Sequence, residues 1–121
     1  MQDYRKLLVW QKAHQLAIDT YALPQYLLRP ECWPLREQIL RSVLSISSNI
    51  AEGAGRGSNA DFVRFLWHSM GSCNELESQL LLAADLHFIP APSHEALGNQ
   101  ISEVRRMLTG LITSLKVTSS Q

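Results

Sequence analysis

The sequence predicts an all-α protein whose residues 1–121 form a single domain, an antiparallel up-and-down four-helix bundle. Apolar residues recur at intervals of three and four along four separate segments, which is the period of an α-helix. Alternating β-branched runs are scarce, and the sequence lacks the Asn-Gly and Asp-Gly turns typical of β-hairpins. With 121 residues, of which 45% are hydrophobic, the chain is large enough to bury one core without metals or disulfides.

The four helices are expected at about residues 7–28, 34–53, 58–87 and 93–116. Short connections between them make sequential neighbours antiparallel. Pro24 lies inside the first range, and a proline there removes a backbone donor and clashes with the preceding turn. We therefore expect the first helix to kink or stop near Leu23.

The starts of the other three helices carry residue types that favour a helix N-terminus. Pro34 suits the first turn of the second helix, where its missing N–H loses no hydrogen bond. Ser58, with Asp61 three residues later, resembles a capping box at the start of the third helix. Ser93 is expected to cap the fourth helix.

Charge and cysteine content exclude several classes of protein. Eleven basic residues balance eleven acidic ones, so the basic footprint of a typical nucleic-acid-binding protein is missing. Cys32 and Cys73 are too few for a disulfide framework or a zinc site, and they indicate reduced thiols. No apolar run approaches the ~20 residues of a membrane span, and the N-terminus lacks the apolar stretch of a signal peptide. We therefore expect a cytoplasmic protein without membrane contact.

The stretch "SISSNIAEGAGRGS", residues 45–58, places small and polar residues where the second helix should face a core. Ser45 and Asn49 are four residues apart and therefore share one side of that helix. Arg41 and Glu52 lie with Ser45 on a neighbouring diagonal that ends in a candidate ion pair, and Glu75 of the third helix is a candidate to face it. Carboxylates near a guanidinium also suggest an acid–base group. We favour a structural cluster, since no serine or cysteine has an identifiable base to activate it.

Gly53, Gly55 and Gly57 separate the second helix from the third. Glycines before a helix N-terminus, with Arg56 beside them as a candidate anion contact, are one feature of phosphate-binding loops. Such loops follow a β-strand, and the Walker sequence ends in Gly-Lys-Ser/Thr, whereas here a helix precedes the glycines and that ending is missing. The glycines are therefore expected to cap the second helix and turn the chain.

The sequence indicates no metal, cofactor or catalytic site. Di-iron bundles use Glu-x-x-His pairs, and none occurs here. The four histidines, His14, His68, His87 and His94, are well separated in sequence or lack ligand partners three or four residues away. Cys73 falls on the core stripe of the third helix, where it resembles a small hydrophobic residue. We expect no enzymatic activity and no cofactor.

Trp10, Trp67 and Met70 extend the apolar surface of the first and third helices beyond one core-facing stripe. Burying a side chain of this size contributes about 1.5–3 kcal/mol, which favours a second buried surface. His14 lies one turn from Trp10 and is expected at the same surface. These residues are predicted to form the interface of a homo-oligomer, and the competing interpretation is a wide core stripe.

Three stretches carry a family resemblance: "LLVWQKAHQLAIDTY", "LREQILRSVLSISSNIAEGAGRGSNADFVRFL" and "GSCNELESQLLLAADL". They resemble the bacterial four-helix-bundle proteins known as the 23S ribosomal RNA intervening sequence family, and the match covers nearly the whole chain. The resemblance adds Gln38 to the polar cluster. The family is similar to the accessory variability determinant proteins of diversity-generating retroelements, which form ring-like pentamers and bind nucleic acid and a reverse transcriptase. The resemblance therefore implies a pentamer.

Together these observations predict a non-enzymatic cytosolic scaffold or adaptor that assembles with itself and has a further protein as a candidate partner. The alternative is an accessory protein associated with nucleic acid or a ribonucleoprotein. The retroelement proteins are strongly basic, whereas this chain has a formal net charge of +0, so nucleic acid is not the favoured partner.

Overall fold

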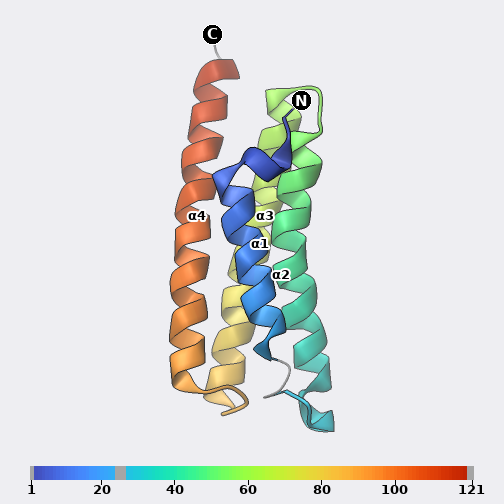
Figure 1. The fold of residues 1–121 in the computed structure, drawn as a ribbon, viewed down its shortest axis with the longest axis vertical. Coiled ribbons are helices and arrows are strands. Elements are labelled where there is room, and N and C mark those ends of the chain that lie inside the picture. Colours follow the sequence, from blue (N-terminus) through green and yellow to red (C-terminus); the bar gives the residue numbers. More distant parts are fainter. Residues whose placement is uncertain (1, 24–26, 120–121) are drawn as a thin grey trace.

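Four long helices lie side by side in the computed structural model, which describes residues 2–23 and 27–119, the last three by their backbone alone (Figure 1). They are α1 (Leu8–Tyr21), α2 (Trp33–Ala54), α3 (Asn59–Asp85) and α4 (Ala91–Ser119). Two short 3-10 helices, η1 (Tyr4–Lys6) and η3 (Pro30–Cys32), precede α1 and α2. The described residues contain no β-strand, and the prediction of an all-α fold is confirmed.

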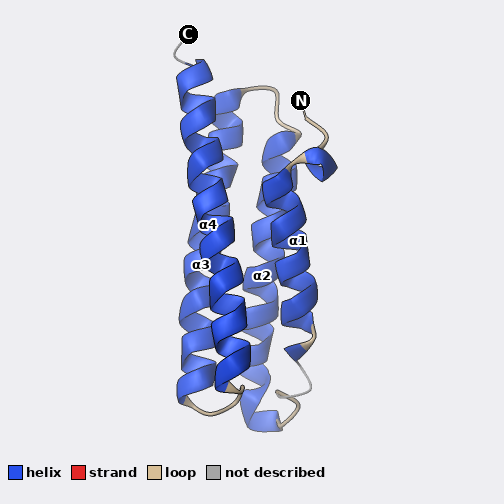
Figure 2. Ribbon diagram, turned by 60° about the vertical axis from the view of Figure 1, so that its left-hand side comes forward, coloured by secondary structure: helices blue, strands red, loops and turns tan. Residues whose placement is uncertain are grey.

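Successive helices run in opposite directions, and this antiparallel arrangement was also predicted (Figure 1). Each helix packs against its neighbours in sequence, and α1 also packs against α4, which closes the bundle. Figure 2 shows the same four helices from a second side, with loops at both ends. No helix in the described part of the chain is long and apolar enough to cross a membrane.

The core is built from one stripe of mostly apolar residues on each helix. In α1 these are Val9, Ala13, Leu16 and Thr20, and each is buried. The largest fully buried side chains of the other helices are Ile39, Val43, Ile46, Ile50, Leu66, Leu76, Leu80, Ile101, Val104 and Leu108. Because each of these contributes about 1.5–3 kcal/mol on burial, the core accounts for most of the driving force of folding.

Helix α1 ends at Tyr21, seven residues short of the range predicted from its apolar period. This agrees with the expected stop near Leu23, and Pro24 itself lies outside the described residues. Helix α2 has Pro34 in its first turn, as predicted. The Ser58 hydroxyl accepts a hydrogen bond from the Asp61 backbone N–H at 3.2 Å, so the predicted cap of α3 is confirmed.

The predicted cap of α4 is wrong, because the helix already begins at Ala91 and Ser93 lies inside its first turn. Pro92 explains the earlier start, since a proline in the first turn has no N–H to leave unpaired and its φ angle suits a helix. The His94 N–H donates to the Pro90 carbonyl oxygen at 3.1 Å, which closes this first turn.

Candidate functional site

The contact between α2 and α3 contains a row of hydrogen-bonded polar side chains, here called the seam, formed by Ser45, Asn49 and Ser72. The Asn49 amide donates to the Ser45 hydroxyl at 3.0 Å and to the Ser45 carbonyl at 2.8 Å. The Ser45 and Ser72 hydroxyl oxygens lie 2.8 Å apart, and Ser72 donates to the His68 carbonyl at 3.2 Å. A hydroxyl carries one proton, so Ser45 is the donor to Ser72 and the chain runs in one direction.

A second bond strengthens the same helix contact one turn away from the seam. The buried Ser69 hydroxyl donates to the Ile46 carbonyl across the two helices at 2.8 Å. Polar groups in a partly buried contact stabilise it only when they are paired, and these serines are paired with one another or with backbone. The seam therefore holds α2 against α3, and none of its hydroxyls bonds to an imidazole that would activate it.

The other members of the predicted polar cluster lie outside the seam. Gln38, Arg41, Glu52 and Glu75 are exposed. The candidate ion pair forms with a different partner, because the Glu52 carboxylate lies 3.8 Å from the Arg56 guanidinium one helical turn later. Arg41 and Glu75 make no ion pair within the part of the chain that the structure describes. The structure thus joins Ser45 and Asn49 through Ser72 and leaves the charged residues on the surface.

The three glycines differ from one another in their surroundings. Gly55 is the C-terminal cap of α2, with its N–H bonded to the Ala51 and Glu52 carbonyls at 3.3 and 3.2 Å. Gly53 lies inside the helix, and a Cβ there would meet Phe62 Cδ1 and Phe65 Cβ, both at 2.9 Å. Gly53 is therefore needed for the close packing of α3 on α2, a role that the sequence did not indicate. A Cβ at Gly57 would meet no atom within 4 Å.

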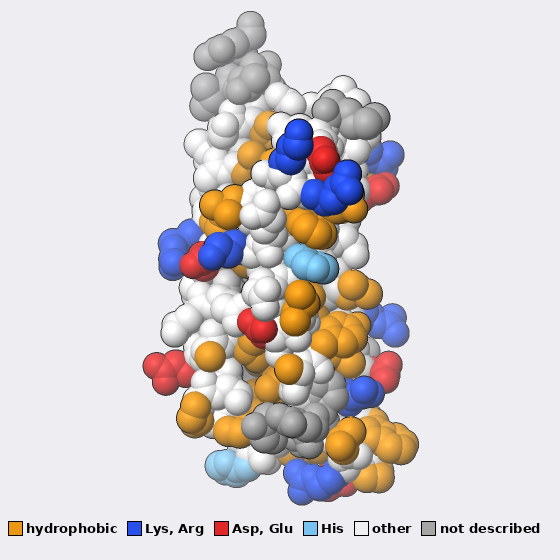
Figure 3. All heavy atoms as spheres, in the orientation of Figure 1, with side chains coloured by type: hydrophobic (Ala, Val, Ile, Leu, Met, Phe, Trp, Pro, Cys, Tyr) orange, Lys and Arg blue, Asp and Glu red, His pale blue; other side chains and the backbone are white. Residues whose placement is uncertain are grey.

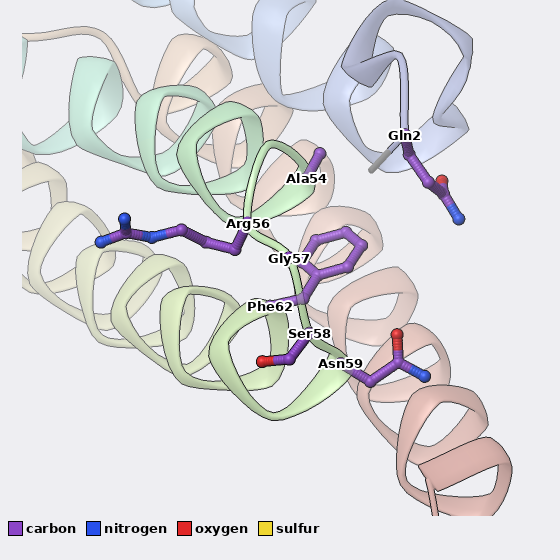
Figure 4. A pocket seen from close by; sticks show the side chains of 7 residues that line it. All are labelled: Gln2, Ala54, Arg56, Gly57, Ser58, Asn59 and Phe62. Atoms are coloured by element: carbon purple, nitrogen blue, oxygen red, sulfur yellow. The ribbon is translucent and has the colours of Figure 1, made fainter.

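Arg56, the candidate anion contact, borders a pocket of about 100 Å³ at the turn between α2 and α3. Figure 4 shows that its side chain extends away from Gln2, Ser58 and Asn59, which line the same pocket. The guanidinium lies instead over the ring of Phe65, 4.8 Å from the centroid, and Arg64 lies 4.6 Å from the same centroid. Both arginines thus lie over one aromatic ring, and this cluster was not predicted from the sequence.

Trp10 and His14 form an aromatic stack on the outside of α1. Their ring centroids are 4.7 Å apart, with an angle of 14° between the planes. Tyr4 of η1 adds an edge-on contact to Trp10 at 4.9 Å. Tyr4 was not predicted as part of this surface because it precedes the expected first helix, although its closeness to Trp10 in sequence pointed to such a contact.

The side of α1 on which this stack lies follows from its other contacts. Lys12 and Asp19 bond to Glu103 and Gln100 of α4, so that side of α1 faces α4. Trp10, His14, Ala17 and Tyr21 lie on the opposite side of the core stripe, toward α2. On α2 the seam faces α3, so Leu40 and Leu44 lie on the side toward α1.

We call these six residues, Trp10, His14, Ala17, Tyr21, Leu40 and Leu44, the α1–α2 surface. Tyr21 and Leu44 retain 47% and 51% of their accessible area, which is high for large apolar side chains. Figure 3 shows hydrophobic side chains gathered over this part of the molecule. A large exposed apolar patch is typical of an interaction site.

Trp67 lies on a different side of the bundle, where α3 faces α4. The Lys116 ammonium group of α4 is 5.6 Å from the centroid of its ring, and the indole remains 52% exposed. Met70, the other predicted interface residue of α3, packs partly buried against the core. We call the area around Trp67 and Lys116 the Trp67 surface.

Comparison with known protein families matches residues 5–110 to the description "23S rRNA-intervening sequence protein". The chain belongs to this family. A crystal structure from Bacteroides thetaiotaomicron, of a protein of unknown function from the S23 ribosomal protein family, is similar in fold with a TM-score of 0.81. It is 29% identical, and the alignment covers 87% of this chain and 98% of the Bacteroides chain. No curated protein matches the chain.

The titratable side chains of this family member bear on whether it holds a reactive or metal-binding group. Burial raises the pKa of the Cys73 thiol to about 12, so the reactive thiolate does not form near neutral pH. Among the described residues, no three histidine, cysteine, aspartate or glutamate side chains converge as a metal site requires. Arg105 of α4 bonds to Asn74 and Glu77 of α3 at 2.7 Å each, and hydrogen bonding to Glu77 raises the pKa of the guanidinium.

Proposed function

We propose that this chain is a non-enzymatic cytoplasmic scaffold or adaptor that assembles into a ring-like homo-oligomer, with five subunits as the expected number. The observation that carries the proposal is the presence of two separate exposed aromatic surfaces on one small bundle. The α1–α2 surface retains 47% exposure at Tyr21, and the Trp67 surface retains 52% at Trp67. The number five comes from the resemblance to the accessory variability determinant proteins, and a further protein is a candidate partner.

The positions of the two surfaces favour a ring over a two-fold dimer. One surface lies between α1 and α2 and the other between α3 and α4. A two-fold dimer buries the same patch on both subunits and would leave the second surface in water. A contact between unlike surfaces buries one of each kind, and closing the ring leaves neither exposed.

The seam supports a structural role for the polar stretch of α2. Its hydroxyls bond to one another and to backbone carbonyls, which fixes the helices that carry the two surfaces. A cytoplasmic location is consistent with Cys32 and Cys73, which are both free and buried.

Mixing two variants, each with a charge introduced into one surface, tests the proposal at the level of the contact itself. Leu44→Glu places a charge in the α1–α2 surface, and Trp67→Glu places one in the Trp67 surface. Each variant alone is expected to be monomeric by light scattering, because each has lost one half of an unlike contact. An equal mixture has one intact contact and is expected to form a heterodimer and nothing larger.

Leu8→Glu is the matched control for this experiment. Leu8 is also strongly exposed, at 58%, but it lies on the side of α1 toward α4, one turn from Lys12. The control should retain the mass of the wild type. If either single variant still formed a discrete dimer, the contact would join like surfaces, and the ring would be excluded.

A second candidate function is favoured by the stack of Arg56 and Arg64 on Phe65. Paired guanidinium groups beside an aromatic ring are typical of contacts with phosphates and bases. Glu52 and Asp61 lie 3.8 and 3.6 Å from the two arginines and partly offset their charge, so the nucleic-acid role stays second. A gel-shift titration of RNA at rising salt tests it. Tight binding that falls steeply with salt, and that Arg56→Ala removes, would establish it.

A further inference from the structure

Residues 2–7 leave the direction of α1 and cross over its first turn. Leu7 has an extended backbone, with φ −79° and ψ 122°, so η1 does not continue into α1. Figure 1 shows this segment lying in front of the bundle between α1 and the end of α2. The Gln2 N–H donates to the Ala54 carbonyl at 2.9 Å, which ties the segment to the last residue of α2. We call residues 2–7 the strap.

The strap covers part of the α1–α2 surface. Tyr4 makes an edge-on contact with Trp10 at 4.9 Å, and His14 stacks on the same indole at 4.7 Å. Trp10 therefore contacts two rings and is half-buried, whereas Tyr21 on the same surface is 47% exposed. Without Tyr4, more of the Trp10 indole would be open to a second molecule.

Few contacts hold the strap closed. Its residues from Gln2 to Lys6 are all exposed, and only Leu7 packs against the core. Besides the bond to Ala54, the Gln11 amide donates to the Arg5 carbonyl at 2.9 Å. Arg5 and Asp3 pair with each other inside the strap and do not tie it to a helix. Segments with so little buried apolar area open locally more easily than the core.

From this geometry we propose that the strap restrains self-association by covering Trp10, and that the subunit contact uses the open form. The inference rests on the proposed function, because the partner is a second copy of this chain. If only the open fraction is competent to associate, the apparent dissociation constant is the intrinsic constant divided by that fraction. Anything that loosens the strap then strengthens association.

Tyr4→Ala in the full chain is the variant that tests the strap. An edge-on aromatic pair is worth a factor of about two to ten in an equilibrium constant. Light scattering over a dilution series should place the dissociation midpoint of Tyr4→Ala about two- to tenfold lower in concentration than that of the wild type. Tyr21→Ala removes a tyrosine from the same surface without touching the strap, and it should raise the midpoint.

Opening of the strap is measured independently of association. In a chain that carries Trp33→Phe and Trp67→Phe, Trp10 is the one remaining tryptophan. Acrylamide quenching of its fluorescence, at high dilution, should increase about twofold or more when Tyr4→Ala is added, as expected if the strap protects the indole.

The outcomes separate the two proposals. Increased quenching with an unchanged or raised midpoint would contradict the strap, while a wild type that still associates would leave the proposed function standing. Unchanged quenching would also contradict the strap, because Tyr4 would then not shield Trp10. A wild type that stays monomeric at every concentration would contradict the proposed function and, with it, the inference.

Discussion

At the scale of single residues, the hydrogen bonds of the seam have a defined direction from Asn49 through Ser45 and Ser72 to the His68 carbonyl. Each member is both paired and partly buried, so removing one partner leaves another group without its bond. A buried group left unpaired costs about 1–3 kcal/mol, which exceeds the net gain of about 0.5–1.5 kcal/mol from a typical bond. The effects of substitutions along the seam should therefore not be additive.

A double-mutant cycle on Ser45 and Ser72 measures this coupling. Each single alanine substitution is expected to lower the free energy of unfolding by about 1–2 kcal/mol, because it removes the bond between the two hydroxyls and leaves the remaining one with one partner fewer. The double variant should lose about 0.5–1.5 kcal/mol less than the sum of the two. Urea unfolding gives these values, and strict additivity would show that the 2.8 Å contact contributes nothing.

The raised pKa of the Cys73 thiol predicts a loss of stability in alkaline solution. Burial raises the pKa to about 12 from an ordinary value of 9.0, so the unfolded chain releases this proton at lower pH than the folded chain does. The contribution is fully present below about pH 9 and is lost as the pH rises toward 12. The melting temperature of the wild type should fall across this pH window more steeply than that of Cys73→Ala. If the melting temperatures of the two proteins fell in parallel, the raised pKa of Cys73 would be contradicted.

At the scale of helices, the close approach of α3 to α2 depends on Gly53. A methyl group there would lie 2.9 Å from Phe62 Cδ1 and 3.3 Å from the Phe62 carbonyl oxygen, closer than van der Waals contact. The carbonyl belongs to the α3 backbone and cannot rotate aside. A larger residue at position 53 must therefore shift one helix against the other.

Gly53→Ala is accordingly expected to destabilise the protein by about 1–3 kcal/mol, in the range of overpacked cores. Gly71→Ala is the matched control, since Gly71 is also inside a helix but a Cβ there meets nothing within 4 Å. That control should stabilise by about 0.5–1 kcal/mol, because alanine has the higher helix propensity. Thermal and urea unfolding of both variants would check the expected opposite signs, and a neutral Gly53→Ala would contradict the packing argument.

Helix positions could be predicted from sequence because their apolar stripes keep one period over several turns. The start of α4 was misjudged because Ser93 and Pro92 compete as start signals, and the proline fixes its backbone one residue earlier. The ion pair suggested between Arg41 and Glu52 is also wrong, because two residues on one side of a helix can still lie far apart along its axis. Eleven residues rise about 16 Å along a helix, so Glu52 pairs with Arg56 one turn away instead.

The candidate site was harder to predict than the helices, because its contacts join residues far apart in sequence. Ser45 and Asn49 could be placed on one side of α2 from their spacing, but the direct bond to Ser72 depends on how α3 docks. The same applies to Gly53, whose role depends on Phe62 and Phe65. A sequence gives the face of a helix on which a residue lies, and it does not give the register of the neighbouring helix.

At the scale of the whole molecule, the seam, the strap and the two aromatic surfaces belong to one arrangement. The seam joins α2 to α3, and these two helices each carry part of a different exposed surface. Monomeric proteins rarely expose large apolar patches, so apolar surfaces on two sides of one small bundle favour an interaction at each. In the proposed assembly, self-association through unlike surfaces would bury both, and the proposed opening of the strap would control access to one of them.

The mass of the wild-type protein in solution tests this account most directly. The chain has a mass of 13.6 kDa, and light scattering coupled to size-exclusion chromatography at micromolar concentration should give a mass near five times that value. A closed ring also predicts one narrow species, without a ladder of larger forms. A mass near 13.6 kDa across the whole concentration range would contradict the proposed assembly.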